Sequence, residues 1–197
     1  MTAVVTVVEG DGEVQALPIL LRRLTEWYAP GEYINIPTPI RVRKDRFINK
    51  EDEFKKHLLL AAAKCNVEEG DWVLILLDAD DDCPVVLADQ IKNRASAYIP
   101  YVHVSVVIAK REYEAWFIAA APSLNGARGF IYDGIQMDAE EPRNAKGWMS
   151  EHMPGKSYKE IMDQPALSAA MDLQQAFDGS RSFRKLCKEW KNQFLVR

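Results

Sequence analysis

The sequence feature that most constrains the fold is an apolar run that ends in a cluster of aspartates, WVLILLDADDD at residues 72–82. Six apolar residues without a break are typical of a strand covered on both faces, as in the centre of a parallel sheet. The acids begin where such a strand would end, and open α/β sheets bind ligands at the carboxyl ends of their strands. Asp78 and Asp80 are therefore candidates to hold a divalent cation, which prefers carboxylate oxygens. The same residues also fit an acidic loop whose aspartates start the next helix.

Length and composition narrow the class of protein. A chain of 197 residues forms one domain with an appendage, or two small domains. We expect no membrane-spanning segment, because no apolar stretch approaches the roughly 20 residues that a bilayer requires. We also expect no signal peptide, since the N-terminus has no basic leader and turns acidic within about ten residues. The three cysteines are odd in number and widely spaced, which favours the cytoplasm and offers no zinc pattern.

Strand and helix patterns alternate over residues 1–121, which predicts an α/β fold with a largely parallel sheet. Pro37 and Pro39 make the second strand an edge strand, and Pro18 is expected near the first turn of the first helix. Right-handed crossovers then give the strand order 2-1-3-4. The predicted strands are residues 3–8, 33–40, 72–77 and 102–109. The predicted helices are residues 14–28, 51–66, 84–97 and 112–121, and a basic loop is expected at residues 41–46.

The remainder of the chain, residues 122–197, is predicted to be a helical extension that packs on the α/β core of residues 1–121. Residues 122–155 show no clear period, and helical patterns follow at 158–162, 167–177 and 182–194. The last pattern predicts a face that packs on the core, formed by Phe183, Leu186, Cys187, Trp190 and Phe194. Its outer side is predicted to carry Arg181, Arg184, Lys185, Lys188 and Lys191. That basic side fits contact with phosphates, docking on an acidic partner, or a solvated helix.

Acidic residues follow three of the predicted strands, and the sheet order brings the ends of the first and third strands together. Converging carboxylates repel one another and raise each other's pKa unless a cation compensates them, so the sequence predicts a divalent-metal site. Taken singly, each acid also fits a helix N-terminus or a solvated first turn. The acids are Glu9 and Glu13 after the first strand, Asp78 and Asp80 after the third, and Glu112 and Glu114 after the fourth.

Several common site motifs are incomplete or missing. EGDGE, at residues 9–13, lacks the third glycine of a dinucleotide-binding fingerprint. The sequence has no P-loop and no G-x-S-x-G elbow. DADDDC begins like an EF-hand loop, but Cys83 stands where the glycine belongs. The three histidines share no ligand spacing.

The pattern of Glu9 after the first strand and Asp78-x-Asp80 after the third resembles the Toprim domain, a Rossmannoid fold of topoisomerases, bacterial primases and OLD-type nucleases. Glu9-Gly10-x-x-Glu13 looks like the E-G-x-x-E of the OLD branch. Together with REYEAWF and SRSF, it also resembles a family of small uncharacterised Toprim-like proteins, often encoded beside AAA or ABC-type ATPases in settings linked to phage defence. The motifs cover about the first 120 residues. The sequence has one acid more than the minimal D-x-D, no assignable topoisomerase tyrosine and no primase zinc module.

This resemblance implies phosphodiester chemistry on nucleic acid that depends on one or two Mg²⁺ or Mn²⁺ ions, with DNA favoured over RNA. It implies a nuclease or nuclease-like subunit that works with a partner ATPase, and it is compatible with a homodimer. Its catalytic residues would be Glu9, Asp78 and Asp80, with Glu9 a ligand or the general acid/base. The implied metal ligands are Glu9, Glu13, Asp78, Asp80, Asp82 and Glu114. The basic candidates for contact with substrate phosphates are Lys110, Arg111, Arg143, Lys146, Lys159, Arg184 and Lys188.

Two other functions fit the same residues. A D-x-D after an apolar strand also occurs in metal-dependent sugar-nucleotide transferases and phosphohydrolases, which would not require Glu9. A Toprim-shaped binding or regulatory module without turnover is the third hypothesis, and it predicts no binding of Mg²⁺ or Mn²⁺ at the carboxylates.

Overall fold

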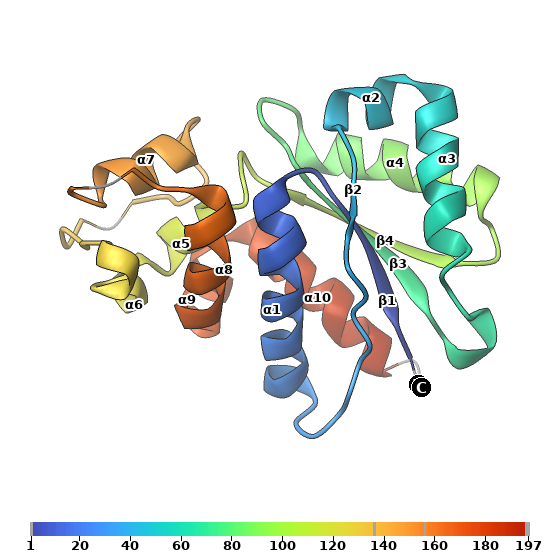
Figure 1. Ribbon diagram of the computed structural model, residues 1–197, viewed down its shortest axis with the longest axis horizontal. Coiled ribbons are helices and arrows are strands. Elements are labelled where there is room, and N and C mark those ends of the chain that lie inside the picture. The colour runs from blue at the N-terminus through green and yellow to red at the C-terminus, as the bar shows by residue number, and fades with distance from the viewer. Residues whose placement is uncertain (1, 136, 156, 196–197) are drawn as a thin grey trace.

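The computed structural model describes residues 2–135, 137–155 and 157–195, without the side chains of residues 194 and 195. Four parallel strands form one sheet in the order β2-β1-β3-β4, flanked by helices (Figure 1). The predicted α/β fold, the parallel sheet and the strand order 2-1-3-4 are confirmed. The strands are β1 (Val4–Val8), β2 (Ile40–Arg41), β3 (Trp72–Asp78) and β4 (His103–Ala109).

The central strand β3 explains the unbroken apolar run, because each face of the sheet is covered by a separate hydrophobic cluster. All seven of its residues are buried. Leu74 and Leu76 join the cluster beneath α1 (Asp11–Tyr28), whereas Ile75 and Leu77 join the cluster beneath α3 (Glu51–Ala62) and α4 (Pro84–Tyr98). A strand buried on both faces needs apolar residues at every position.

The second strand is shorter than expected. The prediction of a strand over residues 33–40 is wrong in extent, since β2 pairs with β1 only through Ile40 and Arg41. Pro37 and Pro39 have no N–H to donate to a ladder, and before them Asn35 makes an isolated bridge to Ala3. The predicted basic loop also needs correction, because Lys44–Asn49 forms the short helix α2.

Three helix boundaries differ from the prediction. Helix α1 begins at Asp11, directly after an extended Gly10, so Pro18 lies in the helix interior and not in its first turn. The missing proline N–H removes one backbone hydrogen bond, and the helix continues to Tyr28. Helix α3 ends at Ala62, before the predicted residue 66. The predicted helix 112–121 is divided into α5 (Ala115–Ala119) and α6 (Ala121–Leu124), with a proline in the first turn of the second.

The C-terminal part is helical and shares one hydrophobic cluster with a face of the sheet. Its longer helices are α8 (Glu160–Ala170), which packs along α1, and α10 (Arg181–Leu195), which contacts β4 and α1. The helix predicted at residues 167–177 is interrupted at Asp172, which caps the N-terminus of α9 (Leu173–Gly179). Residues 122–155 show no period because the helices described within them are short, such as α7 (Ala145–Glu151). The domain boundary at residue 121 stays a prediction.

The apolar face of α10 packs as predicted. Phe183, Leu186, Cys187 and Trp190 are all buried. The ring of Trp190 lies 5.4 Å from that of Trp72, between ring centroids. The side chain of Phe194 lies outside those that the structure describes. Across the described part of the chain, the helices include none with the length and apolarity to cross a membrane.

Candidate active site

Three buried carboxylates come together at the carboxyl edge of the sheet, and we call them the inner acids: Glu13, Asp78 and Glu114. Asp78 ends β3, Glu13 lies in the first turn of α1, and Glu114 directly precedes α5. Their exposed fractions are only 5%, 7% and 0%. The adjacency of β1 and β3 in the sheet brings α1 to the end of β3, as the sequence predicted.

The hydrogen bonds of the inner acids are incomplete. Asp78 Oδ1 accepts the backbone N–H of Tyr113 at 2.9 Å. Glu114 Oε1 accepts the Tyr158 hydroxyl at 2.8 Å and the Gln164 side-chain N–H at 3.2 Å. Within the described residues, the Oε2 atoms of Glu13 and Glu114 are buried and have no hydrogen-bond partner. Buried polar atoms are normally paired, so two orphaned carboxylate oxygens in one place indicate a site for a cation or a water.

Burial and mutual repulsion weaken the acidity of this group. Burial, followed by the carboxylates of Glu114 and Glu13, raises the pKa of Asp78 well above its ordinary value. Burial also raises the pKa of Glu13, and it raises that of Glu114 to about 7. A cation bound among these oxygens would reverse the effect, because it favours the ionised form of each carboxylate.

Lys146 is the counter-charge that the protein itself supplies to the inner acids. Its ammonium lies 3.5 Å from Glu160, 3.7 Å from Glu112 and 3.9 Å from Asp78. Burial by itself lowers the pKa of Lys146, but the carboxylates of Glu114 and Asp78 raise it above its ordinary value. The ammonium of Lys146 faces carboxylates, and its predicted contact with substrate phosphates stays a prediction.

Helix α7, which carries Lys146, is attached to the loop after β4. A carboxylate oxygen of Glu112 accepts the backbone N–H of Lys146 at 3.0 Å. The side chain of Asn144 caps the helix by accepting the N–H of Gly147. The hydrogen bond to Glu112 holds Lys146 near the loop after β4, and this position places its ammonium near Asp78 at the end of β3.

The other aspartates of the DADDD segment behave differently, and we call them the outer acids: Asp80, Asp81 and Asp82. Their side chains are more than half exposed, at 63%, 70% and 62%. Each is paired with a cation. Lys44 lies 2.6 Å from Asp80 and 3.7 Å from Asp82, while Arg111 lies 2.7 Å from Asp81. Sequence reasoning placed Lys44 in a loop, and only the formation of α2 positions its largely buried side chain here.

The backbone at this edge is strained. Asp80 and Arg111 have φ angles of 51° and 65°, in the left-handed region that residues with a Cβ seldom adopt. The N–H of Asp80 donates to the carbonyl of Arg111 at 2.9 Å, which holds the two strained residues together. Each such residue costs on the order of 1 kcal/mol, and strain of this kind gathers at functional sites. The side chain of Asp80, in this left-handed turn, contacts Lys44 of α2.

Glu9 lies between the inner and outer acids. Its pKa is raised mainly by burial, and the carboxylates of Asp80 and Glu13 raise it further while the Lys44 ammonium opposes them. The glycines that follow Glu9 permit close packing. A Cβ on Gly10 would lie 2.2 Å from Glu13 Oε2, and one on Gly12 would lie 2.1 Å from Gln164 Oε1. The absence of a Cβ at Gly10 therefore leaves room for the Glu13 carboxylate, and its absence at Gly12 leaves room for Gln164 of α8 beside the start of α1.

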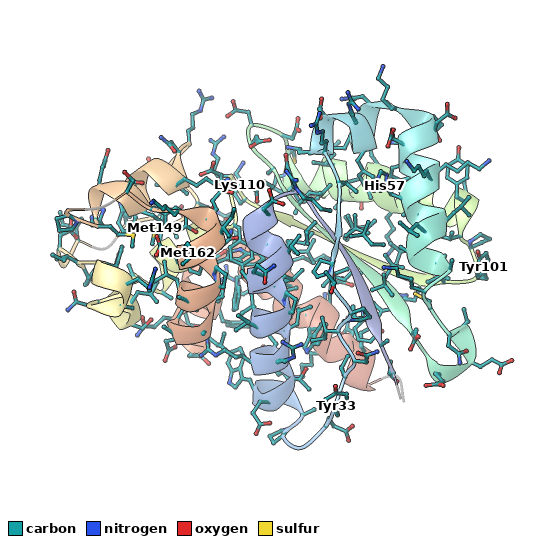
Figure 2. All side chains as sticks on the ribbon, viewed as in Figure 1. Tyr33, His57, Tyr101, Lys110, Met149 and Met162 are labelled. Carbon is teal, nitrogen blue, oxygen red and sulfur yellow. The ribbon has the colours of Figure 1, made fainter. Side chains whose placement is uncertain are left out.

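The other basic residues predicted to contact phosphates lie in several places. Lys110, Arg111 and Arg143 lie at the carboxyl edge, where Arg143 Nε is 3.3 Å from Asp81; Figure 2 shows Lys110 there and Tyr33 at the opposite edge. Arg184 and Lys188 lie on α10 beside the C-terminal end of α1, away from the inner acids. Lys159 is exposed immediately before α8, and its N–H donates to Asp163.

The ligand set proposed for a metal is not preassembled. Across residues 2–135, 137–155 and 157–195, no three Asp, Glu, His or Cys side chains are grouped closely enough to hold an ion as they stand. The orphaned oxygens of the inner acids nevertheless fit a hard cation. Mg²⁺ commonly binds through one or two carboxylates, waters and substrate phosphates, so it does not require a complete protein cage.

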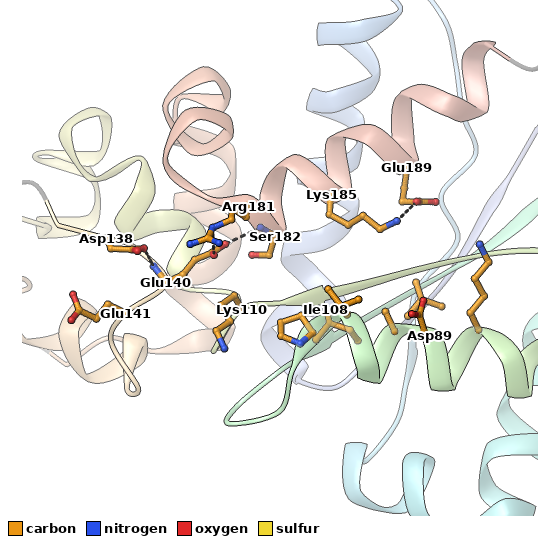
Figure 3. A pocket seen from close by; sticks show the side chains of 15 residues that line it. Asp89, Ile108, Lys110, Asp138, Glu140, Glu141, Arg181, Ser182, Lys185 and Glu189 are labelled. Atoms are coloured by element: carbon orange, nitrogen blue, oxygen red, sulfur yellow. Dashed lines mark hydrogen bonds and ion pairs between the residues drawn. The ribbon is translucent and has the colours of Figure 1, made fainter.

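A groove of about 840 Å³ runs along the free edge of β4, between α4 and α10. Figure 3 shows Lys110 between the segment that carries Asp138 and Glu141 and the part of the groove lined by Ile108 and Asp89. Charges of both signs line the groove, among them Lys110, Arg181 and Glu189. It therefore does not have the single sign of charge that favours a polyanion.

Fold and site together define an α/β protein whose parallel sheet carries a carboxylate cluster at its carboxyl edge. The chain belongs to the family described as Domain of unknown function (DUF4276), whose model matches residues 8–190. The match runs from the end of β1 into α10, so it includes both the acids of the sheet and Lys146 of the C-terminal part. No curated protein and no solved structure matches the chain.

Proposed function

We propose that this protein cleaves phosphodiester bonds in nucleic acid with Mg²⁺ or Mn²⁺, with DNA the favoured substrate. The observation that carries the proposal is the convergence of three buried carboxylates, two of which have an orphaned oxygen. The likeness of Glu9 and Asp78-x-Asp80 to the Toprim pattern supports the same chemistry. In this reading the protein is a nuclease or nuclease-like subunit with a partner ATPase of the AAA or ABC type, acting in phage defence or DNA maintenance.

The inner acids are the residues that would hold the ion, with Glu9 as a further ligand or as the general acid/base. A bound ion lowers the pKa of its water and neutralises charge on the phosphate. The chain orients the carboxylates itself. The N–H of Tyr113 fixes one oxygen of Asp78, while Tyr158 and Gln164 fix one oxygen of Glu114. Such partners of metal ligands hold the orientation of the ligand and tune its basicity.

Lys146 and Lys44 have complementary roles in this proposal. Lys146 compensates the inner acids before an ion binds, and Lys44 holds Asp80 and Asp82 on the solvent side. Arg111 and Arg143 pair with Asp81 at the carboxyl edge. In this proposal, their positive charges neutralise the substrate phosphates.

A cleavage assay tests the proposal. Single-stranded DNA, duplex DNA and RNA are incubated with Mg²⁺ or Mn²⁺, with and without an ATPase encoded beside the gene. We expect metal-dependent cleavage that Asp78→Asn abolishes and that the matched variant Asp81→Asn retains, since Asp81 is exposed and paired with Arg111. Equal activity in Asp78→Asn and the parent protein would contradict the assigned site.

A binding or regulatory module without turnover is the second candidate. It is favoured by the position of the Lys146 ammonium among the carboxylates, where a metal would otherwise lie. The two candidates differ in metal affinity. The module predicts no Mn²⁺ binding at the inner acids, whereas the nuclease predicts binding that raises the melting temperature.

A further inference from the structure

A second concave site lies at the other end of α1, between α1, α9 and α10, and we call it the aromatic–basic pocket. Contacts of α10 with both α1 and α9 bring these helices together on one face of the sheet (Figure 1). The pocket has a volume of about 530 Å³. The residues that carry the argument are Trp27, Tyr28, Phe177, Arg184, Lys188 and Lys191.

Three aromatic rings form one part of the pocket. The ring centroids of Trp27 and Tyr28 are 4.7 Å apart, and Phe177 meets Trp27 edge to face at 6.2 Å. All three side chains are half-buried, so each keeps part of its surface in contact with solvent. Aromatic surfaces that reach solvent beside a basic groove are typical stacking platforms for unpaired bases.

The charged part of the pocket is entirely basic. Lys188 and Lys191 are exposed on α10, and Lys191 Nζ lies 5.9 Å from the centre of the Tyr28 ring. Arg184 is held in place because it donates to the carbonyls of Phe177 and Asp178. None of the described residues that line the pocket is acidic. In a chain with net charge −4, three clustered cations favour an anionic ligand.

We propose that the aromatic–basic pocket binds single-stranded nucleic acid, with a base against the aromatic rings and the adjoining phosphate against the cations. Duplex DNA hides its base faces in the stack, so an unpaired segment fits these rings better. The choice of nucleic acid as ligand rests on the proposed function, but the pocket is separate from the inner acids. Trp27 is 14 positions after Glu13 along α1, which corresponds to about 20 Å of helix.

Binding is measured by fluorescence anisotropy with a labelled single-stranded oligonucleotide in EDTA, so that no metal-dependent step contributes. We expect Lys188→Ala/Lys191→Ala to weaken binding about tenfold or more. It should also reduce the slope of log affinity against log salt by about 1.4, at about 0.7 for each lost phosphate contact. The matched control is Lys56→Ala/Lys64→Ala, which removes two exposed lysines on the far side of the sheet and should change neither quantity appreciably. Equal losses of affinity in the two double variants would overturn the proposal. They would show that the oligonucleotide is attracted by the positive charge of the whole surface and not by this pocket.

The contribution of the bases is measured separately. An abasic oligonucleotide of equal length should bind the parent protein about tenfold more weakly, since a stacked base contributes roughly 1–3 kcal/mol, or about one factor of ten or more. Phe177→Leu preserves an apolar side chain at the same position and should remove most of this preference for bases. Equal binding of abasic and normal oligonucleotides by the parent protein would overturn the proposal.

Two further arms identify the source of the ligand and separate this proposal from the proposed function. Competition by a mononucleotide at concentrations comparable to those of the oligonucleotide would assign the pocket to free nucleotides. That result would contradict the proposal that the pocket binds single-stranded nucleic acid. Asp78→Asn should bind the oligonucleotide like the parent protein, because the pocket lies at the other end of α1. Binding without cleavage would refute the proposed function alone, and cleavage with unaltered binding in Lys188→Ala/Lys191→Ala would refute the pocket alone.

Discussion

Asp78, an inner acid, and Asp81, an outer acid, are three positions apart in the sequence, yet their side chains differ in burial and in the charges they face. Asp78 is buried, and its pKa is raised by burial and by Glu114 and Glu13. Asp81 is 70% exposed and pairs with Arg111 at 2.7 Å. Carboxylates in water are solvated without help, whereas buried ones need a partner charge. The difference assigns the cation-binding capacity of this edge to the inner acids and loop anchoring to the outer ones.

The largest stability effect is expected at Glu114. Its folded-state pKa of about 7 exceeds its ordinary value of 4.5, so the folded protein binds this proton more tightly than the unfolded chain does. The free energy of unfolding must then fall as pH rises from about 4.5 to 7. Glu114→Gln should therefore stabilise the metal-free protein by about 3 kcal/mol at pH 8, and by nothing at pH 4. Urea unfolding at both pH values measures this, and an equal effect at the two would show that Glu114 is not the titrating group.

A smaller loss is expected when the compensating lysine is removed. Lys146→Met should lower the free energy of unfolding by about 2 kcal/mol at pH 8, because it leaves buried carboxylates without their cation. At pH 5 the loss should shrink, since Asp78 and Glu114 take up protons at higher pH than ordinary acids do. Addition of Mn²⁺ at pH 8 should recover part of the stability. A loss of the same size at both pH values, unaffected by Mn²⁺, would indicate a packing role for the lysine.

The smallest effect is expected among the outer acids. Asp81→Asn should change the free energy of unfolding by less than about 0.5 kcal/mol, because exposed ion pairs contribute little. A loss above about 2 kcal/mol in urea unfolding would show that the exposed loop is a structural element in its own right, and it would remove the contrast with Asp78.

The convergence of the acids was predictable because it depends on topology. An apolar run buried on both faces identifies a central strand, and right-handed crossovers place β1 next to β3. Glu9, Glu13 and Asp78 then share an edge. The pattern of alternating strands and helices was sufficient for this much, and the errors fell on short elements such as β2 and α2, where prolines and tertiary packing decide the outcome.

The protonation state of the site was not predictable from spacing. Glu114 is buried because Tyr158 and Gln164 cover it, and these residues lie 44 and 50 positions away in the C-terminal part. Likewise, Lys146 reaches the acids only because Glu112, 34 positions earlier, binds its backbone N–H. The left-handed turn at Asp80 leaves only a weak signal in the sequence, because aspartate adopts this region more often than most residues but does not require it. Long-range packing therefore decides which acids are inner and which are outer.

The central claim is that the inner acids bind the ion and the outer acids do not, and calorimetric titration with Mn²⁺ tests it most directly. The parent protein, Asp78→Asn and Asp81→Asn are titrated at pH 8, where the carboxylates are most ionised. The account predicts that Asp81→Asn binds Mn²⁺ like the parent protein and that Asp78→Asn loses binding. Loss of binding in Asp81→Asn with binding retained in Asp78→Asn, or no Mn²⁺ binding by the parent protein, would contradict it.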